Sequence, residues 1–114
     1  MELNYVFKAK VIKWVDGDTV DLDVDLGFRF HAEMRFRLLG LDTPERGQLN
    51  YREATEFAKS LAPVDKIVLI QTVKDEKADK YGRYLVTVES DGIVVNAKLL
   101  ESGLAKYYDG GKKE

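Results

Sequence analysis

The sequence contains no cysteine and a single histidine, His31, and these two shortages exclude several classes of chemistry. Without cysteine there is neither a disulfide framework nor a thiolate metal site, and the sequence gives no indication of a redox compartment. With one histidine, a His-rich zinc centre is excluded and a Ser-His-Asp triad has only one candidate base. Any chemistry must therefore depend on carboxylates, arginines, lysines and tyrosines.

Long apolar runs and a strong net charge are also missing. No apolar run approaches the ~20 residues of a membrane span, so no membrane association is expected. Lys and Arg number 18 against 20 Asp and Glu, a formal charge of -2, which argues against a protein that coats nucleic acid through many cationic contacts. A local phosphate site is not excluded. The 114 residues, 45% hydrophobic and 33% charged, predict one globular domain over residues 1–114.

No basic segment leads from Met1 into an apolar signal core, because the strand-like run 5–15 follows almost at once. The sequence therefore shows no secretory signal. Two compartments are expected on this basis: the cytoplasm, or the exterior for a secreted protein whose signal has been trimmed.

Strict alternation of apolar and charged residues over 19–26 and 28–38 predicts two half-buried strands joined at Gly27. Because opposed residues share a face, the odd-numbered polar sets should pair with each other, around a loop of three residues. Their charges then pair across the strands in solvent, and His31 is a surface imidazole. The aromatic residues at strand periodicity are expected in the core or at its rim: Trp14, Phe28, Phe30 and Phe36.

The rest of the chain predicts further short elements. Residues 50–61 have helical periodicity before Pro63, and 66–73 and 84–89 read as strands, followed by a short strand over 93–95. Asn96 is expected to cap a helix over 97–102 that Gly103 ends. The predicted fold is mainly β: a five-stranded Greek-key barrel of the OB type, with one helix between strands three and four and a short C-terminal helix.

Three polar clusters interrupt these patterns at strand ends: residues 16–19, 37–45 and 79–83. Each one alone has an ordinary explanation as a turn or a solvated loop. Together they offer carboxylates and two arginines that no turn requires. Such a set can bind a hard cation and a phosphate.

The strings Val-Asp-Gly-Asp-Thr-Val (15–20), Phe-Arg-Leu-Leu-Gly-Leu-Asp-Thr-Pro-Glu (36–45) and Asp-Lys-Tyr-Gly-Arg (79–83) resemble the staphylococcal nuclease (thermonuclease) family. Val95-Asn96 and the later Gly-Leu-Ala (103–105) complete the resemblance, which runs from about Val11 to Ala105 in the family's order. It implies a five-stranded OB barrel that hydrolyses DNA and RNA with Ca²⁺, leaving 3'-phosphate ends. Little base specificity is expected, because the candidate groups all address phosphate and metal and none is an obvious reader of base edges. The expected partner is single-stranded or melted DNA or RNA, bound by a monomer.

By the same resemblance, Asp18 and Asp42 ligate the metal, Thr43 adds its backbone carbonyl, and Asp16 lies in the outer coordination shell. Ca²⁺ prefers six to eight oxygen ligands, so carboxylates, a carbonyl, waters and a phosphate oxygen would suit it.

The resemblance also assigns the residues that handle the substrate. Glu45 activates or orients the attacking water, Arg37 and Arg83 hold the phosphate, and Lys80 and Tyr81 bind a neighbouring terminal phosphate. Arginine forks suit this role because they contact two phosphate oxygens at once. Most of the rate acceleration should then be electrostatic.

Two departures from the family pattern bear on the substrate. The loop after Glu45 is short, and the chain stops at Glu114 without the family's last helix. Base stacking is then left to Tyr107 or Tyr108, either of which could equally be a surface aromatic. The alternative to a nuclease is a non-catalytic module of this family that binds nucleic acid or protein. Such modules are expected to lose the carboxylates or arginines, and this chain retains them. A nuclease site disabled by the missing helix is the third reading.

Overall fold

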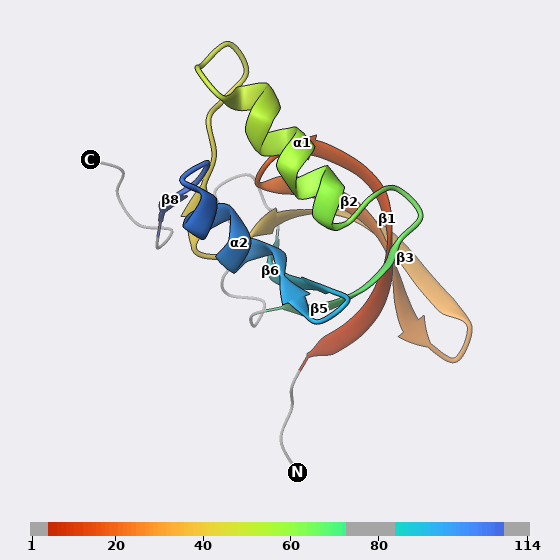
Figure 1. Cartoon of the computed structure of the whole chain (residues 1–114). Helices are drawn as coiled ribbons and strands as arrows, with labels where there is room; N and C mark the ends of the chain where they lie inside the picture. The colour runs from red at the N-terminus through yellow and green to blue at the C-terminus, as the bar shows by residue number, and fades with distance from the viewer. Residues whose placement is uncertain (1–4, 73–83, 109–114) are drawn as a thin grey trace.

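The computed structural model describes residues 5–72 and 84–108 of the chain. Its elements, in order, are β1 (Val6–Asp16), β2 (Thr19–Gly27), β3 (Phe30–Leu38), β4 (Leu41–Asp42), α1 (Tyr51–Leu61), β5 (Ile67–Thr72), β6 (Tyr84–Ser90), β7 (Ile93–Val94), α2 (Val95–Ser102) and β8 (Lys106–Tyr107). Figure 1 shows the strands curled around a common centre, with both helices against the same part of the barrel. Within this described part, no helix is both long and apolar enough to cross a bilayer.

Five strands close into a barrel. Hydrogen-bonded neighbours follow the order β3-β2-β1-β5-β6, and a parallel pairing of β3 with β6, in which Phe36 lies opposite Tyr84, joins the two ends. In the sequence, helix α1 comes between β3 and β5, the third and fourth strands of the barrel. The mainly β, OB-type barrel predicted from the sequence is therefore confirmed.

The core follows from the two-residue period of the strands, since alternate side chains point inward. Each barrel strand contributes buried aliphatic residues, among them Val11, Leu22, Ile70 and Val88. The helices complete the core, with α1 packed on β1, α2 on β6, and each helix on the other. Burial of one such side chain contributes about 1.5–3 kcal/mol, so the stability of the fold resides largely in this cluster.

The β2–β3 hairpin has the predicted pairing of odd-numbered residues, with Asp21 opposite Arg35 and Asp25 opposite His31. The predicted three-residue loop is wrong. The turn consists of Phe28 and Arg29, both with positive φ (54° and 67°), and follows a register shift next to Gly27. Two residues in this conformation match the twist of the strands, whereas residue type alone did not favour it at Phe28.

The hairpin also extends beyond the barrel, which corrects the expectation for two aromatic residues. Trp14 and Phe36 are buried, but Phe28 is 94% exposed and Phe30 is 68% exposed. Alternation in the sequence shows which face a side chain occupies. It does not show whether anything covers that face where the strand continues past the core.

Asn96 lies inside α2 and does not cap it, because the helix begins at Val95. Its side-chain oxygen accepts a hydrogen bond from the Val88 N–H at 3.0 Å, and its amide donates to the carbonyls of Leu39 (3.0 Å) and Val86 (3.1 Å). The amide thus ties the helix to β6 and to the residue after β3. The strand predicted over 93–95 ends at Val94, because α2 begins at the next residue.

Candidate active site

The β1–β2 turn brings the first acidic residue to the site. Gly17 is buried in this turn, and a Cβ built on it would lie 2.9 Å from the Cβ of Ala54 and 3.0 Å from Cγ2 of Thr43. The position therefore requires glycine because α1 and the segment after β4 approach it closely. The Asp-Gly dipeptide predicted a turn, and its physical reason in this fold is the close packing.

Asp18 follows this glycine and is buried. Its Oδ2 accepts the Thr43 N–H at 3.1 Å, its Oδ1 accepts the Thr19 hydroxyl at 3.0 Å, and its carbonyl accepts the Leu38 N–H at 2.8 Å. Burial raises the pKa of Asp18, while the Thr43 N–H, the Arg37 charge and the Thr19 hydroxyl act against that rise. The side chain is therefore held rigidly between β2, the end of β3 and the segment after β4.

Arg37 joins the two predicted metal-binding carboxylates. Its Nη2 lies 2.8 Å from Oδ1 of Asp42 and 3.5 Å from Oδ2 of Asp18, and it also donates to the Leu41 carbonyl at 3.3 Å. The side chain of Arg37 is only 16% exposed. The structure thus brings together Asp18, Asp42 and Arg37, which are separated in sequence.

Tyr108 covers the other side of this arginine. The Arg37 guanidinium carbon lies 5.3 Å from the centre of the Tyr108 ring, within the range of a cation–π contact. The Tyr108 N–H donates to the Gly40 carbonyl at 2.9 Å, which holds the segment after β8 beside the end of β3. Of the two tyrosines suggested for base stacking, Tyr107 is exposed and Tyr108 stacks on the arginine.

Glu45 lies in an exposed turn after Pro44. The turn is closed by two hydrogen bonds: the Glu45 N–H donates to Oε1 of Gln48 at 2.8 Å, and the Gln48 N–H donates to the Glu45 carbonyl at 2.9 Å. The carboxylate of Glu45 therefore stands on a loop tied at its base and remains accessible to solvent. Its role toward a water molecule stays a prediction.

Other predicted site residues are placed elsewhere or not described. Lys80, Tyr81 and Arg83 lie outside the described residues, so their roles stay predictions.

The Asp16 charge acts on Arg35, whose pKa is raised mainly by its hydrogen bond to Asp21 and by the Asp21 charge. The predicted solvent pairing of Asp21 with Arg35 is confirmed, since Arg35 Nε donates to Asp21 Oδ1 at 2.8 Å.

The donor atoms fit a hard cation. Within residues 5–72 and 84–108, no group of three or more His, Cys, Asp or Glu side chains is placed to hold a metal. An ion here would depend on Asp18 and Asp42, completed by main-chain, water and phosphate oxygens, a set that suits Ca²⁺. The buried hydroxyl of Thr43 makes no hydrogen bond in the described part of the chain, so its oxygen is available to a ligand bound at this site.

Comparison with known proteins gives the family. The pattern of the family described as "Staphylococcal nuclease homologue" matches residues 35–114. The chain belongs to this family. The matched range contains Arg37, Asp42, Thr43 and Glu45, whereas Asp18 precedes it.

Individual relatives agree with this family. A thermonuclease of Staphylococcus hyicus is 36% identical over 103 residues, covering 85% of this chain and 57% of the relative. An uncharacterized endonuclease of Escherichia coli O157:H7 is 32% identical over 102 residues, covering 89% and 61%. The uncharacterized protein MJ1439 of Methanocaldococcus jannaschii is 30% identical over 129 residues, covering 90% and 59%. The chain therefore spans about three fifths of the length of these relatives.

Sequence reasoning missed three contributors to the site. Gly17 was interpreted as a turn former, Asn96 as a helix cap, and Tyr108 as either a base-stacking residue or a surface aromatic. In the structure, Gly17 lies against Ala54. Asn96 forms hydrogen bonds with Leu39, Val86 and Val88, and the Tyr108 ring stacks on Arg37. The available signal was that Gly17 and Asn96 each belong to a string that carries the family resemblance, whereas Tyr108 belongs to none.

Proposed function

We propose that this family member is a single-domain, monomeric, Ca²⁺-dependent nuclease. Its proposed reaction is hydrolysis of phosphodiester bonds in single-stranded or melted DNA and RNA, with little base specificity and with 3'-phosphate products. The observation that carries the proposal is the placement of Arg37 between Asp18 and Asp42. The nuclease names of the relatives from Staphylococcus hyicus and Escherichia coli support it.

The arrangement suits a phosphate because both signs of charge meet at one place. Asp18 and Asp42 would hold the cation together with the Thr43 carbonyl, and Ca²⁺ bound there would neutralise charge on the phosphate oxygens. Arg37 lies beside both carboxylates and would donate to the same phosphate. Asp42 and Arg37 are each about one-sixth exposed, which leaves the pair accessible from solvent while limiting dielectric screening.

The proposed bond changes follow from the 3'-phosphate product. Water attacks phosphorus and passes one proton to the Glu45 carboxylate, while the bond between phosphorus and the 5'-oxygen breaks and the departing 5'-oxygen takes a proton from solvent to leave as a hydroxyl. Negative charge gathers on the non-bridging oxygens, and Arg37, with Arg83 as the second proposed donor, stabilises it. Loss of one such donor commonly costs about 2.7–4 kcal/mol in the activation free energy.

The decisive experiment is incubation of the chain with 5'-labelled single-stranded DNA in Ca²⁺, in Mg²⁺ and in a chelator. We expect cleavage in Ca²⁺, little in Mg²⁺, because Mg²⁺ demands octahedral geometry and gives up water reluctantly, and none in the chelator. Equal cleavage in Mg²⁺ alone would contradict the Ca²⁺ assignment. Binding of the DNA without cleavage in any cation would favour the interaction module.

A further inference from the structure

The guanidinium of Arg37 makes its polar contacts through one nitrogen. Nη2 donates to Oδ1 of Asp42 at 2.8 Å and to the Leu41 carbonyl at 3.3 Å, and it lies 3.5 Å from Oδ2 of Asp18. Within residues 5–72 and 84–108, no group accepts a hydrogen bond from Nε or Nη1 of this arginine. A planar group held at one nitrogen can still swing about that point, so these contacts leave the direction of Nε and Nη1 open.

The ring of Tyr108 restrains the rest of the guanidinium. The guanidinium carbon of Arg37 lies over this ring, 5.3 Å from its centre. A cation over an aromatic face is attracted by the quadrupole of the ring. The contact therefore opposes the swing that the polar contacts allow, and it does so without using any of the N–H groups.

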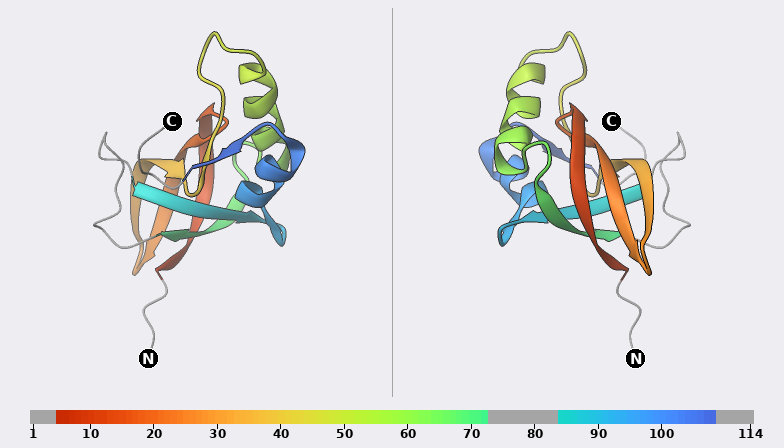
Figure 2. Two further views of the ribbon diagram at one scale, coloured as in Figure 1. Left: turned by 90° about the vertical axis from the view of Figure 1, so that its left-hand side faces the viewer. Right: turned by 90° about the vertical axis from the view of Figure 1, so that its right-hand side faces the viewer.

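Tyr108 is itself held in place by its main chain. Its N–H donates to the Gly40 carbonyl at 2.9 Å, and the preceding strand, β8, pairs with β4. Figure 2 shows the dark blue segment of β8 reaching from α2 toward the end of β3. Gly40 follows Arg37 closely in the chain, so the ring and the arginine are both fixed to the same end of β3.

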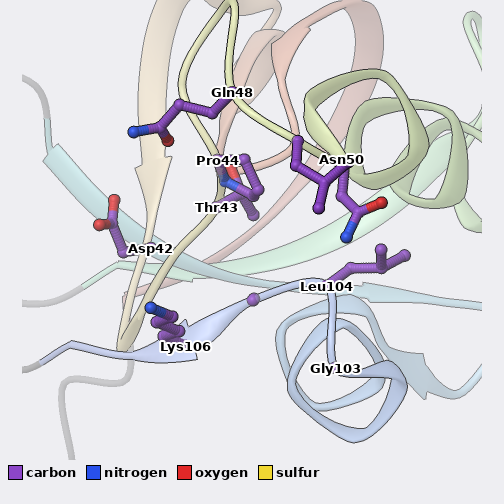
Figure 3. A pocket seen from close by; sticks show the side chains of 10 residues that line it. Asp42, Thr43, Pro44, Gln48, Asn50, Gly103, Leu104 and Lys106 are labelled. Carbon is purple, nitrogen blue, oxygen red and sulfur yellow. The ribbon is translucent and has the colours of Figure 1, made fainter.

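A cavity beside the site does not include this ring. The cavity, of about 560 Å³, lies between the loop after β4 and the segment that leads into β8, and Figure 3 shows Asp42 and Lys106 at one margin and Asn50 at the other. Among the described residues that line it, neither Arg37 nor Tyr108 occurs. A ligand in the cavity would therefore contact Asp42 without reaching the ring, whose face lies against the arginine.

A fixed direction matters because the arginine has to change partner. In the proposed reaction, Arg37 leaves Asp42 and donates to the non-bridging oxygens of the phosphate. A guanidinium fork contacts two oxygens only when it is aligned with them, and alignment in advance lowers the activation free energy by removing an entropy cost. A contact with the ring face can persist during this exchange, since it involves no hydrogen bond.

We propose that Tyr108 is a positioning residue for Arg37. Its ring holds the guanidinium so that Nε and Nη1 are presented to the phosphate while Nη2 gives up its carboxylate partner. The inference rests on the proposed function and names the group that orients its phosphate-binding arginine. Tyr108 acts through Arg37, touches no reacting atom, and has this role in place of base stacking.

The first measurement needs no cleavage and is made in a chelator. The heteronuclear NOE of the arginine Nε–H groups reports fast side-chain motion, and the signal that disappears in Arg37→Lys is that of Arg37. We expect this NOE to fall to the values of the exposed Arg29 and Arg52 in Tyr108→Leu. It should remain high in Tyr108→Phe, which keeps the ring. Phe28→Leu, which removes an exposed ring on the distant hairpin, is the matched control.

The second measurement is the cleavage of single-stranded DNA in Ca²⁺. Tyr108→Leu should lower kcat about 5- to 30-fold, a factor of the size expected for one lost cation–π contact, with KM nearly unchanged. Tyr108→Phe and Phe28→Leu should leave kcat near its wild-type value. In an Arg37→Lys background, Tyr108→Leu should cause little further loss, because a lysine has no fork to orient.

Each outcome decides one of the two proposals. An unchanged Arg37 signal in a folded Tyr108→Leu variant overturns the positioning role, and so does a loss of kcat by the same factor in the Arg37→Lys background. A rise in KM alone also overturns it and would identify Tyr108 as a stacking residue for the substrate. Absence of cleavage by the wild type in every cation would reject the nuclease, and the Arg37 signal would then decide the positioning role by itself.

A thermal melt shows whether Tyr108→Leu is folded. If it is not, Tyr108→Ile takes its place in both measurements, because a branched side chain suits an extended segment.

Discussion

Nη2 of Arg37 lies 2.8 Å from Oδ1 of Asp42 and so occupies the space in which that carboxylate would meet a cation. The same nitrogen is 3.5 Å from Asp18. The arginine therefore neutralises both carboxylates internally. Binding of Ca²⁺ would compete with this contact and leave the guanidinium able to turn toward a phosphate.

The first prediction concerns this competition. Arg37→Ala removes the guanidinium that contacts both Asp18 and Asp42, and breaking such an ion pair costs about 3–5 kcal/mol when it is fully buried. We expect the melting temperature in chelator to fall by roughly 10 °C or more, since each kcal/mol shifts it by about 4–8 °C. Addition of Ca²⁺ should raise it more in Arg37→Ala than in the wild type. Arg35→Ala, which breaks an exposed pair, is the control, and an equal Ca²⁺ response in all three proteins would refute the competition.

The second prediction separates charge from geometry at the same residue. Arg37→Lys keeps the positive charge but loses the planar fork and the stacking on Tyr108. We expect kcat to fall about 100- to 1,000-fold, with a much smaller change in KM, because the lost contact acts mainly in the transition state. Arg35→Lys should leave both constants near their wild-type values. An unchanged kcat in Arg37→Lys would remove this residue from the mechanism.

The third prediction follows from the raised pKa of Asp18. Because the folded chain binds the Asp18 proton more tightly than the unfolded chain, this residue contributes stability at pH values below its unfolded pKa. That contribution is lost as the pH rises through the higher folded pKa. Asp18→Asn should remove this dependence, so that its melting temperature relative to the wild type increases as the pH rises from acidic to neutral. The measurement is a series of thermal melts in chelator, and a constant difference across that range would contradict it.

The fourth prediction tests the packing under the metal ligands. In Gly17→Ala the new Cβ would lie 2.9 Å from the Ala54 Cβ and 3.1 Å from the Ala54 carbonyl carbon, so the turn or α1 must move. Overpacking of this kind costs about 1–3 kcal/mol, and Ca²⁺ affinity should fall as well because the turn carries Asp18. The double variant Gly17→Ala/Ala54→Gly removes one of the two contacts and should lose less than the sum of the single variants. Strict additivity in urea unfolding would show that the Ala54 methyl group is not the obstacle.

The extent to which the sequence predicted the fold depended on how local each determinant is. The faces of β2 and β3 and the pairing of odd-numbered residues followed from alternation, which is a property of neighbouring residues. The turn at Phe28 and Arg29 and the exposure of Phe30 depend on where the barrel ends, which alternation does not contain. The position of Asn96 before apolar residues resembles a cap, and only the fold reveals the carbonyls that it reaches.

The same distinction applies to the candidate site. The order of the motifs was sufficient to group Asp18, Arg37 and Asp42, and the structure places these three in contact. Tyr108 and the cavity beside Asn50 depend on β8, a two-residue strand that pairs with β4. A strand of two residues is too short to show a periodic pattern, so neither feature could be predicted from the sequence.

The parallel contact of β3 with β6 also has a consequence for the order in which the protein forms. Antiparallel neighbours such as β2 and β3 can pair as soon as the short turn between them forms. The partners of β3 in the parallel pairing are much farther along the chain: Tyr84, Leu85 and Val86 pair with Phe36, Arg37 and Leu38. Pairings so distant in sequence form late, because the entropy of closing a long loop opposes them until much of the core has collapsed. Arg37 lies in the middle of this seam. In a growing polypeptide the β2–β3 hairpin can already bring Asp18 and Arg37 together, whereas the barrel itself cannot close beside Arg37 until β6 has left the ribosome.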